Sequence, residues 1–195
     1  QTKMFLDFTI MNYTPFMSVF NNEPPIIKKK HLIKWLKTNY SFLSNKSFIL
    51  NKLNSERDIN FTITIHNKKK YVLKISNPSE KLDILQYQDR LINHLSNNND
   101  LKKYIPKIYH NKIVKYLDKR NRECFVRILS YIDGQIYGDV KTNSNIEKSL
   151  GDLLAKTSIQ LKFFYDKSAY RKFIWDPSNI NWIYKEINIF TGNKK

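Results

Sequence analysis

The chain has 195 residues, 41% of them hydrophobic, and its 34 Lys and Arg against 17 Asp and Glu give a formal net charge of +17. This length and apolar content are sufficient for one sizeable folded domain or a small two-lobed one. No apolar run approaches the ~18 residues that indicate a membrane-spanning helix, and we see no charged-then-apolar leader sequence.

The single cysteine, Cys124, excludes an internal disulfide and fits a reducing compartment, so we expect a cytoplasmic protein with Cys124 as a small buried side chain. The positive charge would attract nucleic acid or an anionic membrane. It consists mostly of lysines scattered through Asn- and Ile-rich sequence, without zinc-finger spacing, an RNP-like pattern or a basic helix. We therefore expect neither partner, although a basic nucleic-acid-binding protein stays open as an alternative.

In chain order, Gln1–Asn22 mixes Phe, Met and Thr without clear periodicity and leads into the turn-forming run Asn21-Asn-Glu-Pro-Pro25. We interpret residues 1–25 as an amino-terminal arm. Apolar residues at helical spacing then predict an amphipathic helix over His31–Tyr40.

Three strands are expected next. One ends near Leu53, a polar loop leads into Asn60–His66, and a turn precedes Tyr71–Ile75. Lys74 is the one central charge of the last strand, and burying an unpaired ammonium is costly, so it must point into water or neutralise an anion. On the pattern alone, a half-solvated edge strand and a solvated hairpin at Ser55–Asp58 are favoured over a phosphate site.

The remaining chain predicts a helix over Glu80–Leu95 and the further strands of an antiparallel sheet at Lys107–His110, Ile113–Tyr116 and Glu123–Ser130. Apolar residues three and four apart predict a long amphipathic helix over Ile146–Phe164, packed in a core.

The run Leu53-Asn-Ser-Glu-Arg-Asp-Ile-Asn-Phe61, followed by Tyr71-Val-Leu-Lys-Ile-Ser-Asn-Pro78, resembles the amino-terminal lobe of the aminoglycoside phosphotransferase superfamily, and its hydroxylysine-kinase-like branch most closely. Matches follow in the same order over roughly Pro24 to Trp182, at Gln88–Leu95, Ile105–Ile108, Phe125–Gly134, Leu150–Ala155 and Trp175-Asp176. The resemblance implies an α+β fold: a protein-kinase-like lobe of antiparallel sheet plus helix over residues 26–132, then the first helices of a truncated second lobe over 133–195.

The resemblance also implies a role for each group. The Ser55–Phe61 loop would offer backbone N–H groups and side chains to nucleotide phosphates, and Lys74 would hold the α- and β-phosphates. Gln88 stands where protein kinases carry the glutamate that aligns this lysine, and the backbone of Ser130–Ile132 would face the base. The implied nucleotide-binding residues are Ser55, Glu56, Arg57, Asp58, Asn60, Phe61, Lys74, Gln88, Ser130, Tyr131 and Ile132.

Kinases of this superfamily carry an H-x-D-x-x-x-x-N loop and a metal-binding Asp downstream of the region of Trp175, and neither motif occurs in the 195 residues. We therefore expect the amino-terminal portion of a small-molecule kinase that uses ATP or GTP to phosphorylate a hydroxyl of an amino alcohol or hydroxy amino acid. The Mg²⁺ ligands would lie in the missing carboxyl-terminal part, and fusion to an aminotransferase in a longer protein is compatible with the resemblance. A non-catalytic interaction module stays open as an alternative.

Overall fold

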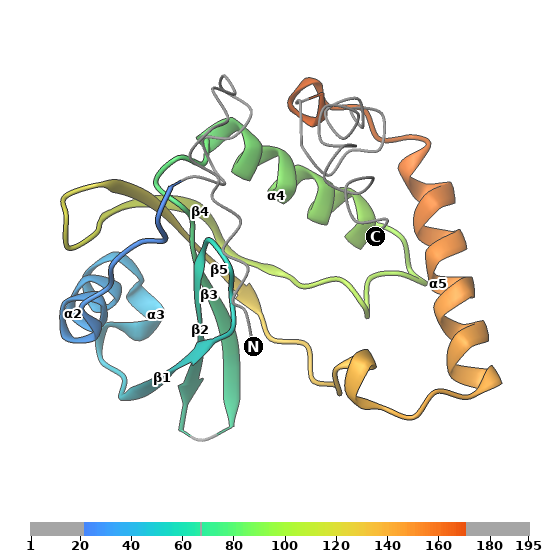
Figure 1. Cartoon of the computed structure of the whole chain (residues 1–195), viewed down its shortest axis with the longest axis horizontal. Coiled ribbons are helices and arrows are strands. Elements are labelled where there is room, and N and C mark those ends of the chain that lie inside the picture. Colours follow the sequence, from blue (N-terminus) through green and yellow to red (C-terminus); the bar gives the residue numbers. More distant parts are fainter. Residues whose placement is uncertain (1–21, 67, 171–195) are drawn as a thin grey trace, which may run out of the picture.

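The computed structural model describes residues 22–66 and 68–170 (Figure 1). The helices of this part are α2 (Lys29–Asn39), α3 (Ser41–Ser44), α4 (Leu82–Ser96) and α5 (Ser144–Leu161), with short 3₁₀ turns η3 (Tyr137–Asp139) and η4 (Lys167–Ala169). The strands are β1 (Phe48–Leu53), β2 (Ile59–Ile65), β3 (Lys69–Ile75), β4 (Ile108–Leu117) and β5 (Glu123–Ser130). None of the described helices is long and apolar enough to cross a membrane.

The five strands form one antiparallel sheet in the order β1-β2-β3-β5-β4. β3 is therefore a central strand, and the edge-strand interpretation of Lys74 is wrong. The two short strands predicted at Lys107–His110 and Ile113–Tyr116 are one strand, β4, with a register shift between Tyr109 and Val114. His110 within the shift has a φ of 68°. Such a bulge keeps the strand continuous while it interrupts the alternation that the sequence analysis followed.

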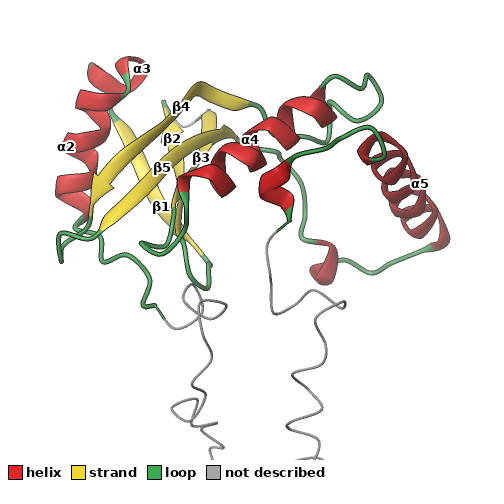
Figure 2. Ribbon diagram, turned by 90° about the horizontal axis from the view of Figure 1, so that it is seen from above, coloured by secondary structure: helices red, strands yellow, loops and turns green. Residues whose placement is uncertain are grey.

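One face of the sheet forms the hydrophobic core with α2 and α3, as Figure 2 shows from above. Along β2, Ile59, Phe61, Ile63 and Ile65 are buried while the residues between them are half-buried, which is the period of two expected for a strand. Leu32, Leu36, Tyr40 and Leu43 cover this face from the two helices. α4 crosses the opposite face, so the sheet lies between two helical layers (Figure 2).

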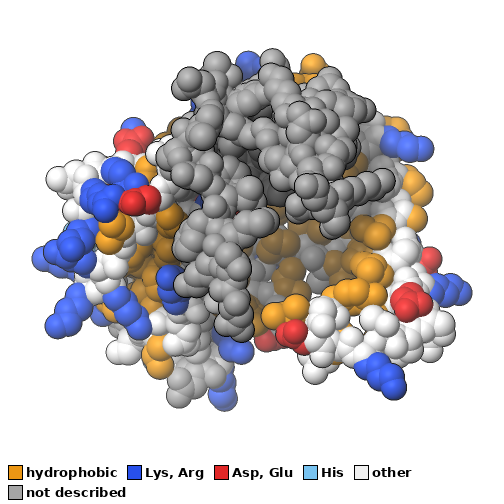
Figure 3. Space-filling model, in the orientation of Figure 1, with side chains coloured by type: hydrophobic (Ala, Val, Ile, Leu, Met, Phe, Trp, Pro, Cys, Tyr) orange, Lys and Arg blue, Asp and Glu red, His pale blue; other side chains and the backbone are white. Residues whose placement is uncertain are grey.

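Exposed lysines lie on α2 and also near both ends of α4, at Lys81 and Lys102. Lys and Arg side chains gather on the side of the molecule that carries α2 and α3 (Figure 3). Lys29, Lys30 and Lys34 are exposed on α2, whose first turn contains no acidic residue.

α5 lies outside these layers and touches the rest of the described chain near its carboxyl-terminal end (Figure 1). His94 Nε2 lies 3.0 Å from the carbonyl oxygen of Gln160, and the His94 ring packs against Phe164. No residue of α5 is buried, and Leu154 is 59% exposed. The prediction of a helix here is confirmed, but the expected core packing of its apolar stripe is wrong, because too little of the described chain covers it.

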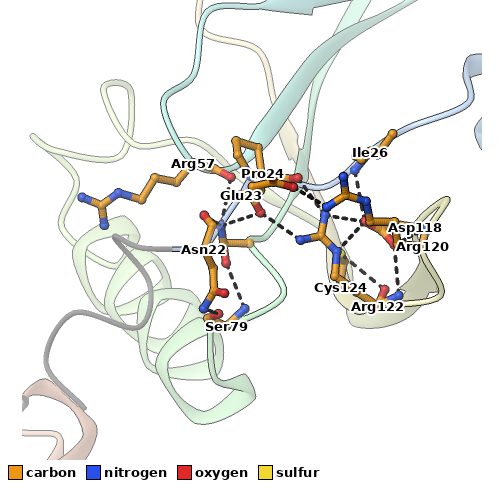
Figure 4. Close-up of polar contacts among 11 residues, drawn as sticks. Asn22, Glu23, Pro24, Ile26, Arg57, Ser79, Asp118, Arg120, Arg122 and Cys124 are labelled. Carbon is orange, nitrogen blue, oxygen red and sulfur yellow. Dashed lines mark hydrogen bonds and ion pairs between the residues drawn. The ribbon is translucent and has the colours of Figure 1, made fainter. Parts of the chain in front are cut away.

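The last residues of the predicted arm are tied to the sheet (Figure 4). Ile26 N donates to Asp118 Oδ2 at 3.1 Å, and Arg122 donates to Asp118 Oδ2 and to the Pro24 carbonyl at 2.7 and 2.9 Å. The Asp118 carboxylate is buried and also accepts from the N–H groups of Arg120 and Arg122. We call this group, residues 23–26 with Asp118, Arg120 and Arg122, the amino-terminal clamp. Residues 1–21 of the predicted arm lie outside the described residues, as does Trp175-Asp176.

Candidate functional site

The site predicted from the sequence begins at the loop between β1 and β2. Residues 54–58 connect the end of β1 at Leu53 with the start of β2 at Ile59. A hollow of about 580 Å³ lies at this loop and is lined by Lys52, Leu53, Asn54, Ser55 and Glu56. Two of the predicted nucleotide-binding residues, Ser55 and Glu56, thus border an open concave surface.

The loop is held by its far end. Asp58 Oδ1 accepts a hydrogen bond from the backbone N–H of Asn77 at 3.0 Å. The carboxamide of Asn77, which is fully buried, donates to the carbonyl oxygens of Asn22 and Arg57 at 3.1 and 3.5 Å. Asp58 Oδ1 and the Arg57 carbonyl therefore fix the loop, and contact of Arg57 or Asp58 with a nucleotide stays a prediction. The sequence analysis missed Asn77, whose only local signal is the turn-forming Asn-Pro pair after an apolar strand.

Three polar side chains stand in a row on the α4 face of the sheet. Asn60, Lys74 and Arg127 are successive cross-strand partners on β2, β3 and β5. Directly paired residues project from the same face of a sheet, with Cβ atoms about 5 Å apart. The residues on either side of them, such as Leu73 and Ile128, point to the core. The row therefore brings together residues more than 50 positions apart in sequence.

Lys74 is half-buried and, within the described chain, forms no ion pair. Burial lowers the pKa of its ammonium, the negative charge of Asp58 opposes this, and the positive charge of Arg127 lowers the pKa further. A buried cation without a counter-ion is costly, and an anionic ligand would remove that cost.

Two side-chain oxygen atoms, one in the β1–β2 loop and one in this row, also have no hydrogen-bond partner in the described chain. Ser55 Oγ and Asn60 Oδ1 are both buried and make no hydrogen bond. A buried polar atom left unpaired costs about 1–3 kcal/mol, so such atoms are uncommon in folded proteins unless a ligand or water satisfies them. The loop and the row thus contain an unpaired hydroxyl oxygen at Ser55, an unpaired carboxamide oxygen at Asn60 and the Lys74 ammonium, which has no ion pair among the described residues.

Arg127 is already matched by α4. Its guanidinium donates to Asp89 Oδ1 at 2.7 Å, to Gln88 Oε1 at 2.6 Å and to the Leu85 carbonyl at 3.2 Å. The Arg127 side chain is only 5% exposed. Gln88 lies on α4 as predicted, but its carboxamide oxygen accepts from Arg127.

The remaining predicted residues have different environments. The side chain of Phe61 packs in the hydrophobic core, so only its backbone is available to a ligand. The Ser130 N–H donates to the Lys107 carbonyl and Ser130 Oγ accepts from the Lys107 N–H, both at 2.8 Å. The Tyr131 ring lies 5.2 Å from the Lys70 ammonium, and Ile132 is exposed. The N–H and hydroxyl of Ser130 are therefore bonded to Lys107, and contact of Ser130–Ile132 with a base stays a prediction.

No group of three His, Cys, Asp or Glu side chains suited to a metal ion occurs in residues 22–66 and 68–170. The magnesium ligands expected from the resemblance stay a prediction for other residues.

No protein family model matches the sequence, and no curated protein matches it. Among solved structures, the chain is similar to a microcompartment-associated aminopropanol kinase, with a TM-score of 0.56 and 13% sequence identity. The match covers 76% of this chain and 45% of that one. The fold is kinase-like. The α+β class with its antiparallel amino-terminal-lobe sheet is thereby confirmed, at the level of the fold, and this kinase-like chain spans less than half the length of the aminopropanol kinase.

Proposed function

We propose that this chain is the nucleotide-binding, amino-terminal part of a small-molecule kinase of the hydroxylysine-kinase-like type. The parent reaction moves the γ-phosphoryl group of ATP or GTP to a hydroxyl of an amino alcohol or hydroxy amino acid. The observation that carries the proposal is Lys74, a half-buried ammonium without an ion-pair partner among the described residues, in a kinase-like fold. The similarity to a kinase of an amino alcohol supports the proposed substrate class.

The proposed binding mode follows from the three unpaired groups. The Lys74 ammonium supplies a point charge for the phosphates, as lysines do in other nucleotide sites. The Ser55 hydroxyl can donate to a phosphate oxygen, and rotation of the Asn60 carboxamide by 180° about its last bond presents two N–H donors. Ser55 Oγ and Asn60 Oδ1 are buried and unpaired within the described chain, and Lys74 is half-buried without an ion pair there, so phosphate binding would engage all three groups.

We also propose which segments of the protein carry which function. Residues 26–132 bind the nucleotide, and 133–195 begin a second, helical lobe. The catalytic His-x-Asp loop and the Mg²⁺ ligands belong to residues beyond these 195 in a longer protein, which could include a fused aminotransferase. On this proposal the chain by itself binds nucleotide and transfers no phosphoryl group, because transfer needs a positioned metal and an aspartate near the acceptor hydroxyl.

The test is nucleotide binding by the 195-residue chain, measured by calorimetry with ATP and with GTP. Lys74→Ala is expected to weaken binding by at least about tenfold, which corresponds to a loss of roughly 1.4 kcal/mol. Lys34→Ala is the matched control, because it removes the same charge from an exposed position on α2, on the other side of the sheet. Equal weakening by both variants, or no nucleotide binding by the wild type, contradicts the proposal.

The same proteins separate the alternatives. A nucleic-acid-binding protein would bind random oligonucleotides with an affinity that falls steeply with salt and survives Lys74→Ala. A non-catalytic interaction module would bind neither nucleotide nor oligonucleotide. A longer natural protein that contains the His-x-Asp loop should phosphorylate an amino alcohol, and Lys74→Ala should lower that activity by at least about tenfold.

A further inference from the structure

The inference concerns the basic side of the molecule, which is formed by α2, α3 and β1 (Figure 3). No Asp or Glu occurs between Glu23 and Glu56, and this stretch contains seven lysines. None of the seven forms an ion pair within residues 22–66 and 68–170. This part of the surface therefore carries positive charge that the described chain does not compensate. The seven residues are Lys28, Lys29, Lys30, Lys34, Lys37, Lys46 and Lys52.

Three of these lysines form a row along the outside of α2, which we call the basic row. Lys30, Lys34 and Lys37 are four and three residues apart, so neighbouring Cβ atoms lie about 5–6 Å from each other on one side of the helix. Lys30 and Lys34 are exposed and Lys37 is half-buried. Regularly spaced ammonium groups fit a partner with a repeating negative charge better than they fit a single small anion.

Two exposed histidine rings border the same surface. His31 follows Lys30 on α2, and its ring lies 5.9 Å from the ring of Tyr116 on β4. The His110 ring, at the bulge of β4, stacks on Phe42 of α3 with a centroid distance of 4.9 Å and an angle of 20°. Histidine rings next to basic side chains are groups on which the bases of a single-stranded nucleic acid can stack.

An anionic membrane is the other repeating negative charge that a basic helix can meet. A helix that lies in a membrane interface inserts its apolar face into the lipid. On α2 that face is already used, because Leu32 and Leu36 are fully buried in the core against the sheet. The charge and the exposed rings together therefore favour nucleic acid over lipid.

We propose that α2 and α3, together with β4 at His110, form a docking surface for single-stranded nucleic acid. The basic row binds phosphates, and the rings of His31 and His110 meet bases. This surface lies on the face of the sheet opposite α4, whereas Lys74 lies on the α4 face, so the inference does not rest on the proposed nucleotide site. Binding of an oligonucleotide through the basic row is thus compatible with binding of ATP through Lys74.

The experiment measures binding of the 195-residue chain to a fluorescent oligo-dT of about 20 nucleotides, by anisotropy at several salt concentrations. The row variant is Lys30→Gln/Lys34→Gln/Lys37→Gln, since Gln removes the charge and keeps a similar helix propensity. Each phosphate contact to a single strand contributes about 0.7 to the slope of log K against log salt. The slope of the row variant is therefore expected to be smaller by about 2, with an affinity at least about tenfold lower at low salt.

A matched control removes the same charge elsewhere. Lys141→Gln/Lys148→Gln/Lys162→Gln changes three exposed lysines in the segment that carries α5, and its slope is expected to stay within about 0.7 of the wild type. Circular dichroism checks the folding of both triple variants. Equal changes of slope in the two variants would mean that binding follows net charge alone, and this overturns the inference. A wild type that does not bind oligo-dT overturns it as well.

If the row variant does not fold, the double variant Lys30→Gln/Lys34→Gln, at two exposed positions, decides with an expected decrease in slope of about 1.4. An unchanged slope in the double variant contradicts the inference. The proposed function is judged separately, because ATP binding of the folded row variant is expected to equal that of the wild type within about twofold. Loss of ATP binding in the row variant would mean that the two sites are one, which also contradicts the inference.

Two further measurements test the choice of nucleic acid. His31→Ala/His110→Asn removes both rings, and Asn tolerates the left-handed φ of 68° at position 110. This variant is expected to bind oligo-dT at least about fivefold more weakly, because a stacked base contributes binding energy at any sequence. The wild type is expected to bind vesicles of phosphatidylserine and phosphatidylcholine more weakly than oligo-dT at the same salt concentration. Unchanged oligo-dT binding by the histidine variant, or equal binding of vesicles, contradicts the assignment to nucleic acid.

Discussion

The sheet with α2, α3 and α4 differs from the segment that carries α5 in how each treats its apolar side chains. In the sheet, residues such as Ile63 and Leu73 are fully buried between helical layers. In the segment from 133 to 170, Leu154 and Phe163 are 59% and 79% exposed. Both regions have a regular apolar pattern, so the pattern by itself does not create a core. A second surface must be present to cover it.

The largest expected effect is on stability and compares a variant in the core of the sheet with a variant on α5. Ile63→Ala removes a buried side chain from β2 and should lower the free energy of unfolding by about 3 kcal/mol, because it leaves a cavity in a closed core. Leu154→Ala on α5 should change it by less than about 0.5 kcal/mol. Urea denaturation measures both. Similar costs for the two variants would mean that the α5 stripe is covered in solution.

A second prediction concerns the amino-terminal clamp, which joins residues 23–26 to the segment between β4 and β5. Burial alone would raise the pKa of the Asp118 carboxyl, but hydrogen bonds from Arg122 and from the backbone N–H groups of Ile26 and Arg120 lower it from 3.8 to about 2. The charged form is thus favoured by folding, which corresponds to about 2 kcal/mol of stability above the ordinary pKa. This contribution should be lost as the pH falls from 3.8 through about 2.

Asp118→Asn tests this prediction, since an amide does not titrate. The variant should unfold at lower urea concentration at pH 7. It should also lose stability less steeply than the wild type between about pH 4 and pH 2, which is roughly the range between the ordinary pKa of the carboxyl and its pKa in the folded protein. Asp152→Asn, an exposed acid on α5, is the control for the same change of charge. Parallel pH curves for the wild type and Asp118→Asn would show that the clamp does not hold this carboxylate in its charged form.

The smallest expected effect lies at the start of α5. The Asn143 side chain caps this helix by accepting from the N–H groups of Asn145 and Ile146 at 3.0 and 3.1 Å. Asn143→Ala should cost about 1 kcal/mol locally. Because α5 packs weakly on the rest of the described chain, hydrogen exchange should speed up in its first turns and stay unchanged in β2 and β3. Asn145→Ala keeps the cap and is the control, and equal exchange in both variants would contradict the prediction.

The predictions made from the sequence succeeded where local periodicity carries the information. Strands β2, β3 and β5 and helices α2, α4 and α5 were expected within a few residues of their observed bounds. Of the predicted nucleotide-binding residues, Asn60 and Lys74 are paired across β2 and β3, and Ser55 and Asn60 carry buried unpaired oxygens, although whether they bind nucleotide stays a prediction. The bulge that keeps β4 continuous escaped the analysis, since one irregular position resembles a turn.

The amino-acid sequence by itself determined which residues form strands and helices and which of their faces are apolar, because backbone geometry sets those periods over a few neighbouring residues. Only the tertiary structure decided that β3 is central, that Asp58 binds Asn77, and that Gln88 binds Arg127 rather than Lys74. These pairings join residues far apart in the chain. They depend on the order of strands and the placement of α4, which no local pattern records.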